Sequence, residues 1–217
     1  MYTRNLLWLV SLVSAAPLYA ADVPANTPLA PQQVFRYNNH SDPGTLDPQK
    51  VEENTAAQIV LDLFEGLVWM DGEGQVQPAQ AERWEILDGG KRYIFHLRSG
   101  LQWSDGQPLT AEDFVLGWQR AVDPKTASPF AGYLAQAHIN NAAAIVAGKA
   151  DVTSLGVKAT DDRTLEVTLE QPVPWFTTML AWPTLFPVPH HVIANMAIAG
   201  VSQRTWFTTV PLCLNSG

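Results

Sequence analysis

Residues 101–120, LQWSDGQPLTAEDFVLGWQR, constrain the fold more than any other stretch of the chain. Asp105 and Gly106 predict a turn, because glycine adopts positive φ easily and the aspartate side chain can accept hydrogen bonds from nearby backbone amides. Pro108 cannot donate to a central strand, so the chain must leave any sheet at this point. Trp103, just before the turn, is expected to anchor the end of a strand in the core. We therefore expect a structural loop rather than a chemical site.

A helix is predicted directly after this loop. Thr110 and Asp113 have the spacing of a capping box, and acidic side chains in the first turn are favoured by the helix dipole. Apolar side chains then recur on one helical face; they are Phe114, Val115, Trp118, Ala121 and Val122. A strand followed at once by an amphipathic helix indicates a protein that mixes both kinds of element.

Other elements alternate along the chain in the same way. Helical spacing predicts helices at 55–63, 142–147 and 190–199. Apolar or alternating runs predict strands at 34–37, 67–70, 93–97 and 164–169. Residues 79–84 are interpreted as loop or one helical turn, and Gly66 as the C-cap of the first helix. The interleaved order favours an α/β (mixed α+β) class over an all-β class.

The first twenty residues have the pattern of a secretory signal peptide. Arg4 supplies a positive charge, residues 6–13 are apolar, and small residues lead to a cleavage position after Ala20. No other stretch is apolar over about 18 residues, so no membrane-spanning helix is expected. Cys213 is the sole cysteine and cannot form an internal disulfide. An exported chain of this kind must therefore be held together by its core.

Charge and motif spacing exclude several classes of function. The net charge of −8, without a basic stripe, argues against a nucleic-acid partner. His190 and His191 are adjacent and do not share a helix face, and no paired His or Cys spacing typical of a metal site occurs. No nucleophile motif is present either. We therefore expect no metal, no cofactor and no catalytic residue, so the chain is not expected to be an enzyme.

Four segments, in this order and spacing, resemble the N-terminal part of the extracytoplasmic solute-binding proteins that deliver oligopeptides and dipeptides to ATP-driven importers. They are LDLFEGLV (61–68), IFHLRSGLQWSDGQPLTAEDFVLGWQRAVDP (94–124), TASPFAGYL (126–134) and DDRTLEVTLEQPVPWF (161–176). The resemblance implies a periplasmic-binding-protein-like fold of type II, with two lobes that close on a ligand. Family members are much longer, so the chain would hold only part of lobe I plus an extra domain.

The resemblance also implies a domain organisation and partners. Residues 1–20 would be the signal peptide, 21–64 the start of lobe I, 65–188 the extra domain and 189–217 a return to lobe I. The protein would act in the periplasm as a monomer, with an ABC permease of the inner membrane as its partner. The tail from about Val201 departs from the family pattern, so we expect a truncated or frameshifted product, and a non-functional relic is one alternative.

The ligand-contacting residues can be carried over from the family motifs. In oligopeptide-binding members the segment after the L-D-P turn lines the cleft, and it maps to Glu52 and Asn54. The aromatic residue of the S-P-aromatic motif, often tyrosine, also touches ligand and is Phe130 here. The missing hydroxyl removes one hydrogen-bond donor, so a small peptide and a non-peptide amphipathic molecule both stay open as ligands. Solvated charge for Glu52 and simple packing for Phe130 are the structural alternatives.

Overall fold

The computed structural model describes residues 38–193, which belong to one compact unit apart from the first of them. The expected signal peptide, the strand at 34–37 and the tail from Val201 lie outside the described residues. The helix expected at 190–199 begins at His190 and is described as far as Ile193. Within residues 38–193, no helix is both long and apolar enough to cross a bilayer.

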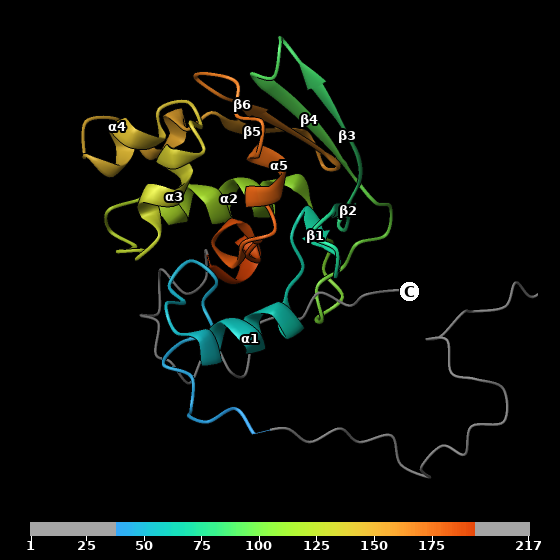
Figure 1. Ribbon diagram of the computed structural model, residues 1–217, viewed down its shortest axis with the longest axis vertical. Coiled ribbons are helices and arrows are strands. Elements are labelled where there is room, and N and C mark those ends of the chain that lie inside the picture. The colour runs from blue at the N-terminus through green and yellow to red at the C-terminus, as the bar shows by residue number, and fades with distance from the viewer. Residues whose placement is uncertain (1–37, 194–217) are drawn as a thin grey trace, which may run out of the picture. The chain divides into compact units, whose positions relative to one another are not determined.

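This unit contains a four-stranded antiparallel sheet in the order β3-β4-β6-β5, which lies at the top of Figure 1. Its strands are β3 (Ala81–Leu87), β4 (Arg92–Leu97), β5 (Val157–Asp161) and β6 (Thr164–Thr168). Tyr93 lies opposite Val167 and Phe95 opposite Leu165, and all four side chains are buried. Because side chains alternate along a strand, these four share one face of the sheet, and that face carries the core.

Helix α2 (Ala111–Val122) lies across the sheet and contacts β5 and β6 (Figure 1). The predicted capping box forms, with the Asp113 carboxylate accepting the Thr110 backbone N–H at 2.8 Å. The predicted apolar stripe is confirmed, since all five of its residues are buried. Phe176 of the short helix α5 (Phe176–Met179) packs on Tyr93, with ring centroids 4.7 Å apart. Helices and sheet therefore share one hydrophobic core.

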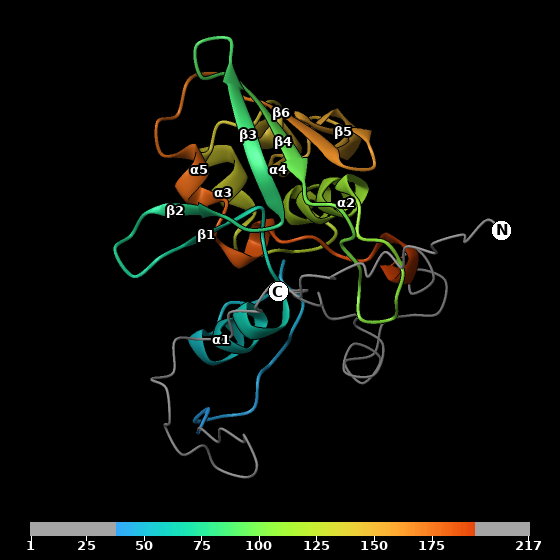
Figure 2. The same ribbon diagram turned by 90° about the vertical axis from the view of Figure 1, so that its right-hand side faces the viewer.

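The remaining elements are short and mostly surround α2. They are α1 (Asn54–Leu63), β1 (Val68–Met70), β2 (Val76–Pro78), α3 (Ala131–Gln136), α4 (Ala142–Val146) and the 3-10 turns η1 (Val152–Ser154) and η2 (Pro183–Leu185). Strands β1 and β2 form a separate antiparallel hairpin that adjoins β3 (Figure 2). The predictions at 55–63, 67–70, 93–97, 142–147 and 164–169 are confirmed to within two residues. Strands β2 and β5 and helices α3 and α5 were not predicted.

The loop before α2 has the structural role that its sequence predicts. Trp103 is fully buried, and Gly106 adopts a φ of 82°. Strand β4 ends at Leu97, as predicted, so Trp103 lies in the loop and not at the strand end. The loop is closed by an isolated bridge between Gln102 and Pro108. Asp105 is held between the Gln107 backbone N–H and the His191 ring. Burial favours a higher pKa for Asp105, but these hydrogen bonds outweigh it and hold the pKa below its usual range.

The buried carboxylate of Asp113 connects this loop to the turn that begins at His190. We call Asp113, Trp103, Thr110 and His190 the Asp113 cluster. Asp113 is completely buried. Beyond the Thr110 N–H, it accepts the Trp103 indole N–H at 3.2 Å and the His190 backbone N–H at 2.9 Å. The His190 Nδ1 atom lies 2.7 Å from the same carboxylate. Asp113 therefore does more than cap a helix, because it also fixes the start of the His190 turn.

Two expectations about local structure were wrong. The segment 79–84 is not loop or helix, since it leads into β3, where Trp84 pairs with Phe95. This pairing supplies backbone hydrogen bonds from the next strand of a hairpin, which the side-chain spacing of 79–84 alone does not reveal. Gly66 is not a helix cap, since α1 ends at Leu63 and its C-cap is Phe64, which is already extended. A Cβ at Gly66 would lie 2.7 Å from the Phe186 ring, so close packing between these two segments explains the glycine.

Gly117 in α2 offers a test of the packing between that helix and the segment after η2. A Cβ at Gly117 would lie 2.7 Å from the backbone oxygen of Phe186. We expect Gly117→Ala to lower the free energy of unfolding by about 1–3 kcal/mol, as overpacking does. Urea denaturation monitored by circular dichroism measures this change.

The matched control is Gly132→Ala in α3, where no atom lies within 4 Å of the added Cβ. That variant should be as stable as the parent or more stable by up to about 1 kcal/mol, because alanine favours a helix over glycine. A Gly117→Ala protein as stable as Gly132→Ala would contradict the close packing.

Candidate functional site

A cavity of about 800 Å³ opens between α1, β1 and the segment from α5 to η2; we call it the Trp182 cavity. Its lining residues are Ala57, Leu61, Asp62, Leu63, Phe64, Glu65, Gly66, Val68, Trp69, Met70, Tyr133, Thr178, Ala181, Trp182, Pro183 and Phe186. Leu61, Trp69 and Trp182 are 48%, 50% and 43% exposed there. Large apolar side chains left open around one concavity are typical of a surface that binds a ligand or another segment of protein.

The position of the Trp182 ring is set by two aromatic neighbours. Phe130 meets it edge-on, with centroids 5.8 Å apart and an interplanar angle of 74°. Tyr133 lies on another side at 6.4 Å, and its hydroxyl donates to the backbone oxygen of Met179 at 3.2 Å. Burial raises the pKa of Tyr133 above its usual range. These two ring contacts therefore restrict the orientation of the Trp182 side chain.

The formal charges on the cavity lining are negative. Asp62 and Glu65 line it, and no lysine, arginine or histidine is found among the described residues that do. Glu65 accepts a hydrogen bond from Arg98 at 2.8 Å. Burial raises the pKa of Glu65, and the nearby Arg98 charge only partly offsets that rise. The cavity thus combines apolar and aromatic walls with carboxylates.

Of the three sequence-predicted ligand residues, the structure places one, Phe130, in contact with a residue that lines this cavity. Asn54 is the first residue of α1, and Ala57 and Leu61, three and seven residues later, line the cavity. Residues at these spacings share one helix face. Phe130 is half-buried and contacts the cavity through Trp182. Glu52 is exposed in the segment before α1, and neither it nor Asn54 or Phe130 is a lining residue.

The aromatic residues that form the walls were not predicted from the sequence. Trp69 lies within the predicted strand at 67–70, and Trp182 precedes a proline in a turn-rich segment. Their exposure is the signal that identifies them, and exposure depends on which distant segments cover each ring. Trp175, equally exposed at 59%, does not line the cavity, which shows that residue type alone does not indicate the site.

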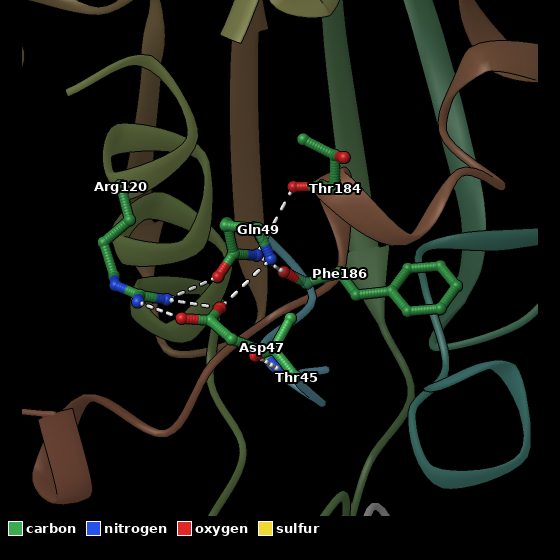
Figure 3. Close-up of polar contacts among 6 residues, drawn as sticks. All are labelled: Thr45, Asp47, Gln49, Arg120, Thr184 and Phe186. Carbon is green, nitrogen blue, oxygen red and sulfur yellow. Dashed lines mark hydrogen bonds and ion pairs between the residues drawn. The ribbon is translucent and has the colours of Figure 1, made fainter. Parts of the chain in front are cut away.

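A buried polar cluster fixes the segment that carries Glu52 and Asn54 (Figure 3). We call Asp47, Gln49 and Arg120 the Asp47 cluster. The Arg120 guanidinium donates to both carboxylate oxygens of Asp47, at 3.2 and 2.7 Å. It also donates to Gln49 Oε1 at 2.6 Å. Asp47 and Gln49 are almost completely buried, so this pair of hydrogen-bonded charges is well shielded from water.

The same cluster reaches η2 and the residue that follows it. Gln49 Nε2 donates to the backbone oxygens of Thr184 and Phe186, at 3.3 and 3.1 Å (Figure 3). The Asp47 carboxylate accepts the Gln49 backbone N–H at 3.1 Å, which shapes the turn at Pro48. Because Phe186 lines the Trp182 cavity, the cluster connects the segment before α1 to one wall of the cavity.

Comparison with known proteins gives consistent results at the level of family, sequence and structure. Residues 75–210 match the model of the bacterial extracellular solute-binding proteins, family 5 Middle. The chain is 49% identical over 185 residues to the periplasmic oligopeptide-binding protein OppA of Salmonella typhimurium, covering 85% of this chain and 34% of OppA. It is 46% identical over 180 residues to the periplasmic murein peptide-binding protein MppA of Escherichia coli, covering 83% of this chain and 33% of MppA.

Solved structures agree with this relationship. Haemophilus influenzae OppA in complex with the peptide RPPGFSPFR matches with a TM-score of 0.73 and 40% identity, over 78% of this chain and 33% of that chain. The unliganded open form of MppA matches with a TM-score of 0.70 and 43% identity, over 76% and 31%. The chain therefore spans about a third of the length of the relatives it matches. The expected mixed α/β, periplasmic-binding-protein-like fold is confirmed for this part of the protein.

Proposed function

Because the chain belongs to the bacterial extracellular solute-binding proteins of family 5, we propose that it supplies part of the ligand cleft of a periplasmic component for peptide uptake by an ABC importer. The relatives it matches are peptide-binding proteins rather than enzymes. The observation that carries the proposal is the Trp182 cavity, whose wall residue Trp182 packs against Phe130.

In this proposal Glu52, Asn54 and Phe130 contact the ligand from one side. The described residues would then form one wall, and a second lobe would close over the ligand from the other side. Ligand contacts to both lobes shift the population towards the closed form. The Asp47 cluster supports this assignment, because it holds the segment before Glu52 against Phe186 of the cavity wall.

The domain organisation belongs to the same proposal. Residues 1–20 direct export to the periplasm, 21–64 begin lobe I, 65–188 form an extra domain, and 189–217 return to lobe I. The contact between Gly66 and Phe186 supports these limits, because it brings the two ends of the 65–188 segment together. The complete protein would work as a monomer with an inner-membrane permease.

Peptide binding by the chain alone should be measurable but weak. With one wall of the cleft, we expect dissociation constants in the range of about 0.1–10 mM, which correspond to modest binding free energies. Titration of the indole N–H signals of Trp69 and Trp182 with short peptides, followed by nuclear magnetic resonance, detects binding in this range. Calorimetry with a peptide mixture gives the opposing test, since a sub-micromolar affinity would contradict a half-formed cleft.

A non-peptide amphipathic molecule is the second candidate ligand, and one observation favours it. Phe130 lacks the hydroxyl that the family often supplies at this position, and its neighbours Trp182 and Tyr133 present aromatic surface. The same titration with aromatic and aliphatic carboxylic acids separates the two candidates. Shifts of Trp69 and Trp182 by the acids but not by peptides would overturn the peptide assignment. In a relic without function, neither the peptides nor the acids would shift the signals of Trp69 and Trp182. Reading the DNA downstream of codon 200 in all frames would then test for truncation.

A further inference from the structure

Strand β3 forms one edge of the four-stranded sheet (Figure 1). From Arg83 to Leu87 it pairs in continuous register with β4. Within the described part of the chain, residues 83–86 pair through their backbone with no other segment. Helix α2 contacts the sheet at β5 and β6, at the other end of the strand order. The backbone groups on the outer side of β3 are therefore a template for a further strand.

Two opposite charges lie next to each other on this edge. Arg83 and Glu85 project from the same face of β3, because alternate residues of a strand share a face. Their exposed side chains meet at 3.1 Å, and the His96 ring lies 2.9 Å from Glu85. Both contacts use Oε1 of Glu85, so Oε2 accepts no hydrogen bond from the described residues. Glu85 can therefore bind a further cation across the edge.

The order of these charges selects one register for a second copy of the same strand. In an antiparallel pair with two-fold symmetry, the residue on the axis faces its own copy, and its two neighbours face each other. With Trp84 on the axis, Arg83 of each copy faces Glu85 of the other. An axis at Arg83 or at Glu85 places like charges directly opposite each other, which destabilises a sheet.

We propose that the β3 edge is an interface for a second copy of this chain, paired antiparallel about Trp84 so that each Arg83 faces the partner's Glu85. The half-buried Trp84 rings would then lie opposite each other, and such aromatic pairs stabilise neighbouring strands. Ile86, which is exposed, would lie diagonally across from the partner's Trp84, within reach of its ring.

This interface is separate from the proposed ligand cleft. The described residues that line the Trp182 cavity include none from β3, so pairing at this edge does not cover the cavity. A contact through one strand is small, and small interfaces are typical of weak, transient complexes. The monomer that the proposed function requires is therefore the main species in dilute solution.

Sedimentation equilibrium of the full chain measures this association. Over loading concentrations from about 10 µM to 1 mM, we expect a monomer–dimer equilibrium with a dissociation constant on the order of 0.1 mM. Amide signals of residues 82–87 should shift with concentration in nuclear magnetic resonance spectra, which locates the contact on the chain.

Exchanging the two charges tests the register. Arg83→Glu and Glu85→Arg each place like charges opposite one another, so each should weaken association by about tenfold. The double variant restores opposite charges and should associate to within about threefold of the parent. Lys125→Glu and Glu112→Arg are the matched controls, because they make the same changes of net charge at exposed positions outside β3. Both controls should keep the parent affinity.

Each outcome decides the proposal. A chain that stays monomeric at the highest concentration overturns the interface, and so does association that neither single exchange weakens or that the controls weaken equally. Loss of association in the single variants without recovery in the double variant overturns it as well. Recovery in the double variant supports it, because a strand that was merely damaged would not regain affinity. None of these results depends on whether peptides bind at the Trp182 cavity.

Discussion

Asp113→Ala is expected to lower the melting temperature of the protein by on the order of 10 °C, which corresponds to about 3–5 kcal/mol of unfolding free energy. The carboxylate is completely buried and accepts hydrogen bonds from the Trp103 indole, the Thr110 backbone and the His190 backbone. Alanine accepts none of them. The indole N–H of the buried Trp103 then stays without a partner, which costs more than the net value of the hydrogen bond itself.

The control for this variant lies one residue away. Glu112→Ala removes the same charge from the same helix turn, but Glu112 is exposed, so its loss should cost less than about 1 kcal/mol. Asp113→Asn should fall between the two, because one amide oxygen remains as an acceptor while the amide nitrogen faces donors. Thermal unfolding of all three proteins, monitored by circular dichroism, gives the comparison. Similar melting temperatures for Asp113→Ala and Glu112→Ala would show that the Asp113 cluster contributes little.

Arg120→Met should have a comparable effect on stability and a distinct effect on local dynamics. Methionine keeps much of the side-chain volume but leaves the Asp47 carboxylate, whose side chain is 5% exposed, without its guanidinium partner. Removing one member of such a buried pair costs about 3–5 kcal/mol. Gln49 Oε1 loses its 2.6 Å hydrogen bond as well. We therefore expect lower stability together with faster amide hydrogen exchange in residues 45–54.

Arg83→Met is the matched control, because Arg83 also pairs with a carboxylate, Glu85, at 3.1 Å. Both side chains of that pair are about half exposed, at 57% and 46%. Breaking such an exposed pair should cost no more than about 1 kcal/mol and leave exchange in residues 45–54 unchanged. Hydrogen exchange measured by mass spectrometry provides the local readout. Unchanged exchange in 45–54 in Arg120→Met would contradict a role for the Asp47 cluster in positioning that segment.

The elements that the sequence predicted correctly have short-range signals. In α2, the Thr110–Asp113 spacing and the apolar stripe lie within about three turns of one helix, and both are confirmed. In β6, alternation places Leu165 and Val167 on the buried face. Strand β3 was missed because its exposed pattern, with Trp84 half-buried and Ile86 exposed, becomes a strand only through pairing with β4. Its structure depends on a partner that local periodicity does not identify.

The candidate site illustrates the same limit at longer range. Phe130 and Asn54 were predicted from a family resemblance, and their assignment to ligand binding stays a proposal. Trp69 and Trp182 were not predicted as wall residues of the cavity. Whether such a ring stays exposed depends on which other segments of the fold cover it. The role of Asp113 was predicted only in part: its spacing to Thr110 indicated a helix cap, whereas its contact with His190 joins residues 77 positions apart. Such contacts require the fold to be known.

The close approach of Gly66 to Phe186 has a consequence for protein engineering. If residues 65–188 form a domain of their own, the polypeptide runs into and out of it at one place, where a single methyl group on Gly66 would lie 2.7 Å from the Phe186 ring. A segment whose ends meet in this way can be transplanted as a cassette, since a short linker closes the gap on either side of the cut. The rest of the protein could be rejoined across the cut by a short linker once residues 65–188 are removed. The excised segment could itself be circularised or circularly permuted.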